Sequence, residues 1–415
     1  MYNWRKKIAL AATVASLSLQ GTHIPDPAVW ITVFVHGIMI VKPYFVIGNT
    51  FQLMTDTMKN TNYAATLDRM RHDPFFYQNQ AMQHYGLHKI DLTVCPGNAS
   101  GALAVAYNAI TAMTHQEATI NHYYTFGWAA LLSHTQRVAD AHIFYDQLKT
   151  EIAQFTKQGI TPHIRLLGYS HGGNVCLNLA TVRRERDEEL PFVIDELILL
   201  GTPVQAETDF LTHDALFTTI YHLYSKGDRL QQLDCFSSKR FFSKRVFYNH
   251  AHFCIPPKLR QIELKVTRDK KPHTHKKLSC NFENSRVLST HVPYLRKSAP
   301  GHTELWFFAW TPQHYRDYFP LNPLPVAALV PLIIHEAKKF ENMYGKSPHS
   351  IDLRPMQGII IAKNKRQKDI AISSCLDIAL FDEIRNTVWQ YAPLDYSKKI
   401  YDTHVFDAYN QVTTR

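Results

Sequence analysis

The decapeptide LLGYSHGGNV, residues 166–175, is the feature that most constrains the fold, because it sets a serine among Gly168, Gly172 and Gly173. An apolar run typical of a strand precedes it, and a pattern typical of a helix follows it. A strand that turns into a helix within one residue brings its two arms so close that side chains larger than glycine would collide. The decapeptide therefore predicts a strand–turn–helix unit with Ser170 protruding at the carboxyl edge of a sheet.

Other segments of the chain repeat this rhythm of strand and helix. Helical patterns cover residues 132–159 and the segment that follows the glycines. Strand-like apolar runs occupy residues 28–37, 122–128, 163–170, 195–203, 217–225 and 259–267. Several of these runs are apolar throughout, which is typical of strands covered on both faces. The alternation predicts an α/β fold with a mostly parallel central sheet and helices on both faces.

The domain organisation follows from the lengths between these elements. Residues 40–118 separate the first two strands by far more than an ordinary crossover, so they predict a large insertion into a core of residues 21–310. Residues 311–415 are expected to form a closing helix and a C-terminal extension.

The first residues have the form of a targeting segment. Arg5, Lys6 and Lys7 precede a twelve-residue run of apolar and small residues, 8–19, which is short for a membrane span. This pattern predicts a signal peptide over residues 1–20 and an exported protein. Two alternatives stay open: residues 8–19 remain as a membrane anchor, or they form a buried first helix.

Charge and ligand patterns limit the partners. The net charge of +10 is concentrated in residues 236–280, which are expected either to contact an anionic membrane or to form an ordinary solvated surface. No nucleic-acid-binding motif accompanies this basic stretch, so no nucleic-acid partner is expected. Neither C-x-x-C nor H-E-x-x-H occurs, so no metal site and no cofactor are expected.

Besides GYSHGG, the stretches VFVHGIM (33–39) and LLGTPV (199–204) carry a family likeness. Over about residues 28–310 the chain resembles the α/β-hydrolase fold, and within it the lipases and esterases. The resemblance implies that Ser170 is a nucleophile and that the backbone N–H of Ile38 is an oxyanion donor. The backbone N–H of His171, directly after the serine at the start of a helix, is the second expected donor.

In this family the acid and the histidine follow the nucleophile in that order. The stretch YSKGDRLQQLD (224–234) resembles the lipase acid loop and implies Asp228 as the acid, with Asp234 as the alternative. SAPGHTELWFF (298–308) resembles the histidine loop and implies His302. His291 is the runner-up, and His273 and His275 are more distant choices. The 74 positions between Asp228 and His302 predict a further insertion that contains the basic stretch.

The resemblance implies hydrolysis of carboxylic esters through an acyl-enzyme on Ser170, with a small-molecule or lipid ester as substrate. Lipid esters are favoured by the expected export and by two aromatic stretches of the insertion, VKPYFVIGNTF (41–51) and DPFFYQNQ (73–80). The insertion is expected to act as a lid or acyl pocket, or simply to cover the sheet. An acyltransferase or thioesterase with the same triad, and a non-catalytic binding protein, are the alternatives.

Overall fold

The computed structural model describes residues 27–39, 56, 58–93, 98–114, 119–187, 189–232, 243–267, 299–312, 319–364 and 371–414. The expected signal peptide lies outside these residues, as do the alternatives Asp234, His273, His275 and His291. Within the described parts of the chain, no helix combines the length and the apolar composition that crossing a bilayer requires.

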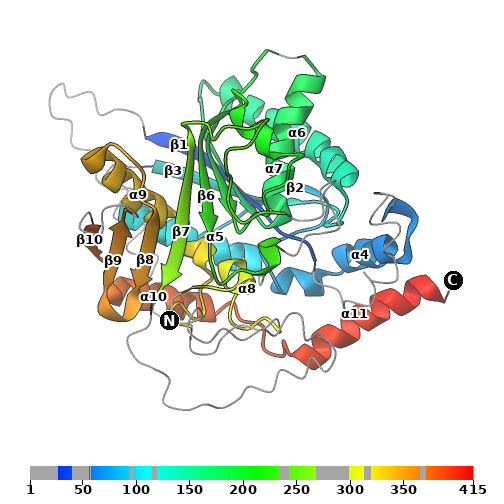
Figure 1. Cartoon of the computed structure of the whole chain (residues 1–415). Coiled ribbons are helices and arrows are strands. Elements are labelled where there is room, and N and C mark those ends of the chain that lie inside the picture. The colour runs from blue at the N-terminus through cyan, green and yellow to red at the C-terminus, as the bar shows by residue number, and fades with distance from the viewer. Residues whose placement is uncertain are drawn as a thin grey trace.

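A single sheet of ten strands organises the described residues, in the order β10-β9-β8-β7-β6-β5-β4-β1-β3-β2 (Figure 1). The strands are β1 (Ala28–Val35), β2 (Gly86–Ile90), β3 (Thr119–Gly127), β4 (His163–Tyr169), β5 (Ile194–Leu200), β6 (Phe217–Tyr224), β7 (Leu259–Val266), β8 (Ser350–Arg354), β9 (Ile359–Lys363) and β10 (Ala371–Cys375). The pairs from β3 through to β8 are parallel, whereas β2 is antiparallel to β3, and β8, β9 and β10 pair antiparallel in turn. The prediction of an α/β fold with a mostly parallel sheet is confirmed.

Helices cover both faces of this sheet. The α-helices of the described residues are α4 (Asn62–His72), α5 (Ala99–Thr114), α6 (His134–Lys157), α7 (His171–Glu185), α8 (His302–Trp306), α9 (Val330–Tyr344), α10 (Ile378–Trp389) and α11 (Lys398–Thr413). One apolar core lies between the sheet and α4, α6, α7 and α11. A second core lies between the opposite face and α5, α8, α9 and α10.

Strand β1 illustrates why the apolar runs form central strands. Val33 and Val35 point into the first core, whereas Phe34 between them points into the second. All three side chains are fully buried. A strand with both faces covered needs apolar residues at every position, and its pattern is therefore a continuous run instead of an alternation.

The expected insertion and the C-terminal region both contribute to this architecture. Of residues 40–118, the described part supplies α4, the edge strand β2 and the helix α5. Beyond residue 310 the chain forms α9, as the helical pattern indicates, and then adds β8, β9 and β10 to the sheet. These three short strands were not predicted from the sequence.

The last helix, α11, packs against α4 and the turn that follows it (Figure 1). The ring of Phe75 stacks on His404 with centroids 3.7 Å apart, and His404 Nδ1 lies 2.9 Å from Asp73 Oδ2. Phe76 meets Tyr401 edge to face. The aromatic residues of the stretch 73–80 thus form part of the first core.

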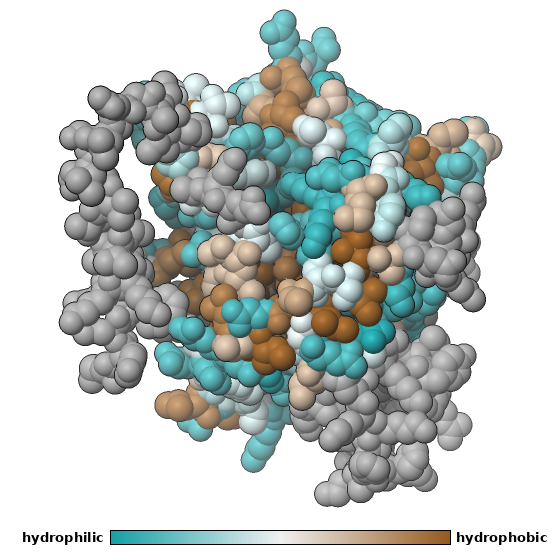
Figure 2. All heavy atoms as spheres, turned by 90° about the vertical axis from the view of Figure 1, so that its left-hand side faces the viewer, coloured by the Kyte–Doolittle hydropathy of each residue, from teal (hydrophilic) through white to brown (hydrophobic). Residues whose placement is uncertain are grey.

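On the face that lies to the left in Figure 1, apolar residues gather in separate patches among hydrophilic ones (Figure 2). The described residues include several large apolar side chains with substantial exposure, among them Met343, Met356 and Ile378. Scattered exposure of this kind is ordinary for a folded protein.

Candidate active site

The carboxyl ends of the central parallel strands meet at one edge of the sheet. In the β1–β4 pair Val35 is opposite Gly168, and in the β4–β5 pair Leu200 is opposite Tyr169. The residues that follow each strand are therefore neighbours in space, although they are far apart in the sequence. This edge is the usual location of ligand sites in α/β sheets.

Ser170 occupies the turn between β4 and α7. Its backbone has φ 51° and ψ −130°, a conformation that a residue with a side chain rarely adopts. A Cβ atom added to Gly168 would lie 2.6 Å from the Cα of Gly173, and one added to Gly172 would overlap the backbone of Val35. Gly168 and Gly173 thus allow the arms of the turn to touch, whereas Gly172, which the sequence assigns to the same contact, instead allows the turn to approach the end of β1.

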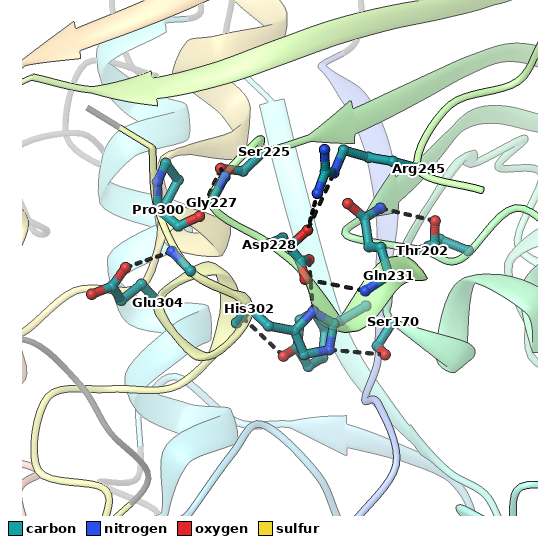
Figure 3. A network of polar contacts seen from close by, with 12 residues as sticks. Ser170, Thr202, Ser225, Gly227, Asp228, Gln231, Arg245, Pro300, His302 and Glu304 are labelled. Carbon is teal, nitrogen blue, oxygen red and sulfur yellow. Dashed lines mark hydrogen bonds and ion pairs between the residues drawn. The ribbon is translucent and has the colours of Figure 1, made fainter. Parts of the chain in front are cut away.

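The structure brings Ser170, His302 and Asp228 together in one hydrogen-bonded chain (Figure 3). Ser170 Oγ lies 3.0 Å from His302 Nε2, and His302 Nδ1 lies 2.7 Å from Asp228 Oδ2. A carboxylate oxygen only accepts, so His302 donates through Nδ1 and its Nε2 is left to accept the serine proton. Asp228 is fully buried, while 11 % of the His302 side chain remains exposed.

Asp228 is held by its own loop, which follows β6. The backbone N–H of Gln231 donates to the free carboxylate oxygen, Oδ1, at 3.3 Å. The guanidinium of Arg245 donates twice to the backbone oxygen of Asp228, at 2.8 and 3.2 Å. Charge-assisted bonds of this kind are stronger than neutral ones. They fix the backbone from which the carboxylate projects.

A serine joins the acid loop to the histidine loop. Ser225 Oγ donates to the backbone oxygen of Pro300 at 2.6 Å and accepts from the N–H of Gly227 at 3.1 Å (Figure 3). Gly227 itself comes so close to the 299–300 backbone that a Cβ atom would lie 2.7 Å from the oxygen of Pro300. The two loops are therefore held at a fixed separation.

His302 is the first residue of α8 and is supported by the residue before the serine. The hydroxyl of Tyr169 donates to the backbone oxygen of His302 at 3.0 Å, and the two rings lie 4.8 Å apart. Burial, with the charge of Asp228, raises the pKa of Tyr169 well above its ordinary value, so its hydroxyl remains a donor. Glu304 accepts from the N–H of Gly301 at 2.6 Å and thereby caps the short helix.

Both expected oxyanion donors lie beside the serine. His171 is the first residue of α7, where backbone N–H groups have no acceptor within the helix. Ile38 follows Gly37, whose added Cβ would lie 3.1 Å from the Cβ of Ser170. Two amides that flank a hydroxyl in this way are suited to binding negative charge that develops on a substrate oxygen.

The supporting residues Tyr169, Ser225 and Arg245 were not predicted from the sequence, although Ser225 belongs to the stretch that marks the acid loop. Among the described residues there is no group of three His, Cys, Asp or Glu side chains that could hold a metal ion. No protein-family model matches this chain, and no curated protein is significantly similar to it.

Proposed function

We propose that the protein is a serine hydrolase that cleaves carboxylic esters through an acyl-enzyme on Ser170. The observation that carries the proposal is the chain of contacts from Ser170 Oγ to His302 Nε2, 3.0 Å, and from His302 Nδ1 to Asp228 Oδ2, 2.7 Å. Serine, imidazole and carboxylate in this order form the arrangement that activates a hydroxyl for nucleophilic attack.

The residues divide the reaction into two halves. As Ser170 Oγ attacks the ester carbonyl, His302 Nε2 takes the hydroxyl proton, and the charge that forms on the carbonyl oxygen is stabilised by the backbone N–H groups of Ile38 and His171. His302 then gives the proton to the departing alcohol. Water, deprotonated by His302, next attacks the acyl-enzyme and releases the acid. Asp228 stays ionised and stabilises the charged imidazole in both halves.

The strain at Ser170 favours this proposal over a binding protein without catalysis. Its φ of 51° costs free energy that the surrounding structure must supply. A surface that only binds has no need for a strained serine in contact with a histidine. The proposed chemistry uses both, because the strained turn presents the hydroxyl to the imidazole.

For the substrate we retain esters of lipids as part of the proposal. The stretch 73–80 does not itself supply an acyl pocket, since Phe76 is 1 % exposed and Phe75 stacks on α11. The other aromatic stretch of the insertion, residues 41–51, lies outside the described residues. Turnover of p-nitrophenyl esters with acyl chains of two to sixteen carbons tests this point. A rise in kcat/KM with chain length supports lipid esters, and a fall limits the proposal to short esters.

The decisive test is Ser170→Ala with a fluorophosphonate probe that labels activated serines. The wild type is expected to be labelled and to hydrolyse a chromogenic ester, and Ser170→Ala is expected to do neither while it unfolds at the same temperature. Ser373→Ala, at an exposed position of β10, is the matched control and is expected to retain both properties. Labelling or turnover that survives in Ser170→Ala contradicts the proposal.

A further inference from the structure

A buried arginine of the insertion lies against the loop that carries one expected oxyanion amide. Arg71, in the last turn of α4, is fully buried, and its NH1 donates to the backbone oxygen of Gln83 at 3.0 Å. NH1 also lies 3.3 Å from His36 Nε2, and NH2 lies 3.7 Å from the sulfur of Met39. Burial lowers its pKa to about 10, so the guanidinium is still charged at neutral pH.

This cation is not explained by packing alone. No carboxylate among the described residues forms a salt bridge with Arg71, and its Nε has no hydrogen-bond partner. A buried charge without a paired carboxylate is costly. Besides the oxygen of Gln83 and the ring of Tyr85, which its guanidinium carbon approaches to 5.2 Å, the guanidinium contacts His36 and Met39, the residues on either side of Gly37 and Ile38 in the sequence.

Arg71 and the backbone oxygen of Gly37 together determine which nitrogen of His36 carries the proton. A guanidinium only donates, so His36 Nε2 must accept. Burial, together with the charge of Arg71, lowers the pKa of His36 well below its ordinary value, so the ring is neutral. Its single proton is therefore on Nδ1, which lies 2.6 Å from the backbone oxygen of Gly37 and donates to it.

This bond sets the plane of the peptide between Gly37 and Ile38. The peptide is trans, so its C=O and N–H point in opposite directions. With the oxygen of Gly37 turned toward His36, the N–H of Ile38 is turned to the other side of the loop. His36 is itself fixed by the indole N–H of Trp128, which donates to its backbone oxygen at 2.7 Å.

We infer that Arg71 is a positioning residue which, through His36, holds the Ile38 amide in the orientation that stabilises the oxyanion. This inference rests on the proposed function. It also connects the insertion and the last helix to the site, because Arg71 belongs to α4 and α11 packs on that helix. In this respect α4 is a fixed part of the active-site frame.

The first test uses two substitutions, Arg71→Met and His36→Asn, made singly and together. Arg71→Met removes the donor to Nε2, so the tautomer of His36 with its proton on Nδ1 is then favoured only by the oxygen of Gly37. We expect kcat to fall about 10- to 100-fold, less than the roughly 100- to 1000-fold loss for removal of an oxyanion donor because the amide is only misoriented, with little change in KM. The inhibition constant of an alkyl boronic acid, whose serine adduct is negatively charged, should weaken by the same factor.

His36→Asn separates positioning from a merely structural role. The asparagine amide places an N–H near the position of Nδ1 and has no tautomer for Arg71 to select. Adding Arg71→Met to His36→Asn should then change kcat by less than about 3-fold, since residues that act through one another have non-additive effects. Tyr77→Phe, which removes a hydroxyl that donates to the backbone oxygen of Arg71, is the control for disturbance of α4 and should keep kcat.

If Arg71→Met lowers kcat as much in the His36→Asn variant as in the wild type, the inference is overturned. A folded Arg71→Met variant with full, Ser170-dependent activity also overturns it. Activity that does not depend on Ser170 overturns the proposed function instead. If Arg71→Met does not fold, ¹⁵N NMR of the wild type gives the same decision, with His36→Asn used to assign the signal. A neutral His36 protonated at Nδ1 is the expected result, and one protonated at Nε2 overturns the inference.

Discussion

The two sides of the candidate active site are built in different ways. On the serine side the contacts are made by backbone atoms: Gly168 touches Gly173 across the turn at Ser170, and Gly172 touches the end of β1. The acid–histidine side combines two loops whose key residues, Asp228 and His302, are 74 positions apart. Hydrogen bonds of side chains such as Ser225 and Tyr169 hold these loops together.

We expect the serine side and the acid–histidine side to respond differently to substitutions. Backbone contact leaves no room for adjustment, so a single added methyl group should disrupt the serine side as a whole. Hydrogen bonds contribute separately, each about 1 kcal/mol. The acid–histidine side should therefore weaken in steps, except at two sterically tight glycines: Gly227, where the two loops touch, and Gly201, whose added Cβ atom would lie 3.1 Å from Asp228 Oδ2.

The largest effect should come from the centre of the acid–histidine side. Asp228→Asn can no longer orient His302 with Nδ1 as donor, and we expect kcat to fall on the order of 10³- to 10⁴-fold without loss of folding. Steady-state kinetics and thermal unfolding measure the two quantities. Asp234→Asn, at the alternative acid, is the matched control and should leave kcat unchanged. If kcat fell in Asp234→Asn and not in Asp228→Asn, Asp234 would be the acid.

The steric argument is tested next by Gly172→Ala. Its Cβ would overlap the carbonyl groups of Val35 and His36, so the turn must move away from the end of β1. We expect a loss of about 3 kcal/mol in the free energy of unfolding and a fall in kcat on the order of 10²-fold, because Ser170 is displaced from His302. Gly301→Ala, on the other side of the site, would meet only Glu304 Oε2, at 3.4 Å, and should unfold within about 0.5 kcal/mol of the wild type. If Gly172→Ala and Gly301→Ala changed stability and turnover equally, the contrast between the two sides of the site would be refuted.

The same contrast explains what could be predicted from the sequence. The turn at Ser170 is encoded by adjacent residues, because its steric demand selects glycine at fixed positions. The central strands are visible because both faces are buried, as at Val33 and Phe34. Asp228 and His302 were predicted through the resemblance and the chain order, and the structure places His302 against Ser170 and Asp228 against His302.

The remainder depends on contacts between distant segments. β8, β9 and β10 have five residues each, and segments this short lack a period that distinguishes strand from loop. Arg71 is one of many basic residues, and only the fold places it beside His36. The role of Ser225 arises from a bond to Pro300, 75 positions away.

A smaller effect is expected from Ser225→Ala, which leaves the oxygen of Pro300 and the N–H of Gly227 without this partner. Buried groups left unpaired cost about 1–3 kcal/mol. We expect kcat to fall about 10-fold, because the histidine loop shifts relative to the acid. Ser243→Ala removes a buried hydroxyl that bonds Gln231 and not the histidine loop, so it should cost stability but preserve kcat. Equal kcat values in both variants would show that the link does not position His302.

The smallest effect is expected on the pH dependence of the free energy of unfolding, through His222 in β6, the strand that precedes Asp228. Burial lowers the pKa of His222, in β6, to about 4. The His222 ring contacts the rings of Phe247 and Tyr224, whose centroids lie 5.1 and 5.8 Å from its own. As the pH falls below about 6.5 the unfolded chain binds a proton at this residue while the folded protein does not, so stability present above that pH is lost toward pH 4.

His222→Leu removes this contribution from the strand beside the acid loop. Between pH 7.5 and 5, the wild type should lose about 2 kcal/mol more unfolding free energy than the variant, as measured by urea titration. Burial raises the pKa of Asp140 to about 6, which acts in the opposite direction, but Asp140 is present in both proteins and cancels in the difference. His36 cancels in the same way. Parallel curves for the two proteins would mean that His222 accepts its proton in the folded state as readily as in the unfolded chain, and the buried environment assigned to β6 would then be wrong.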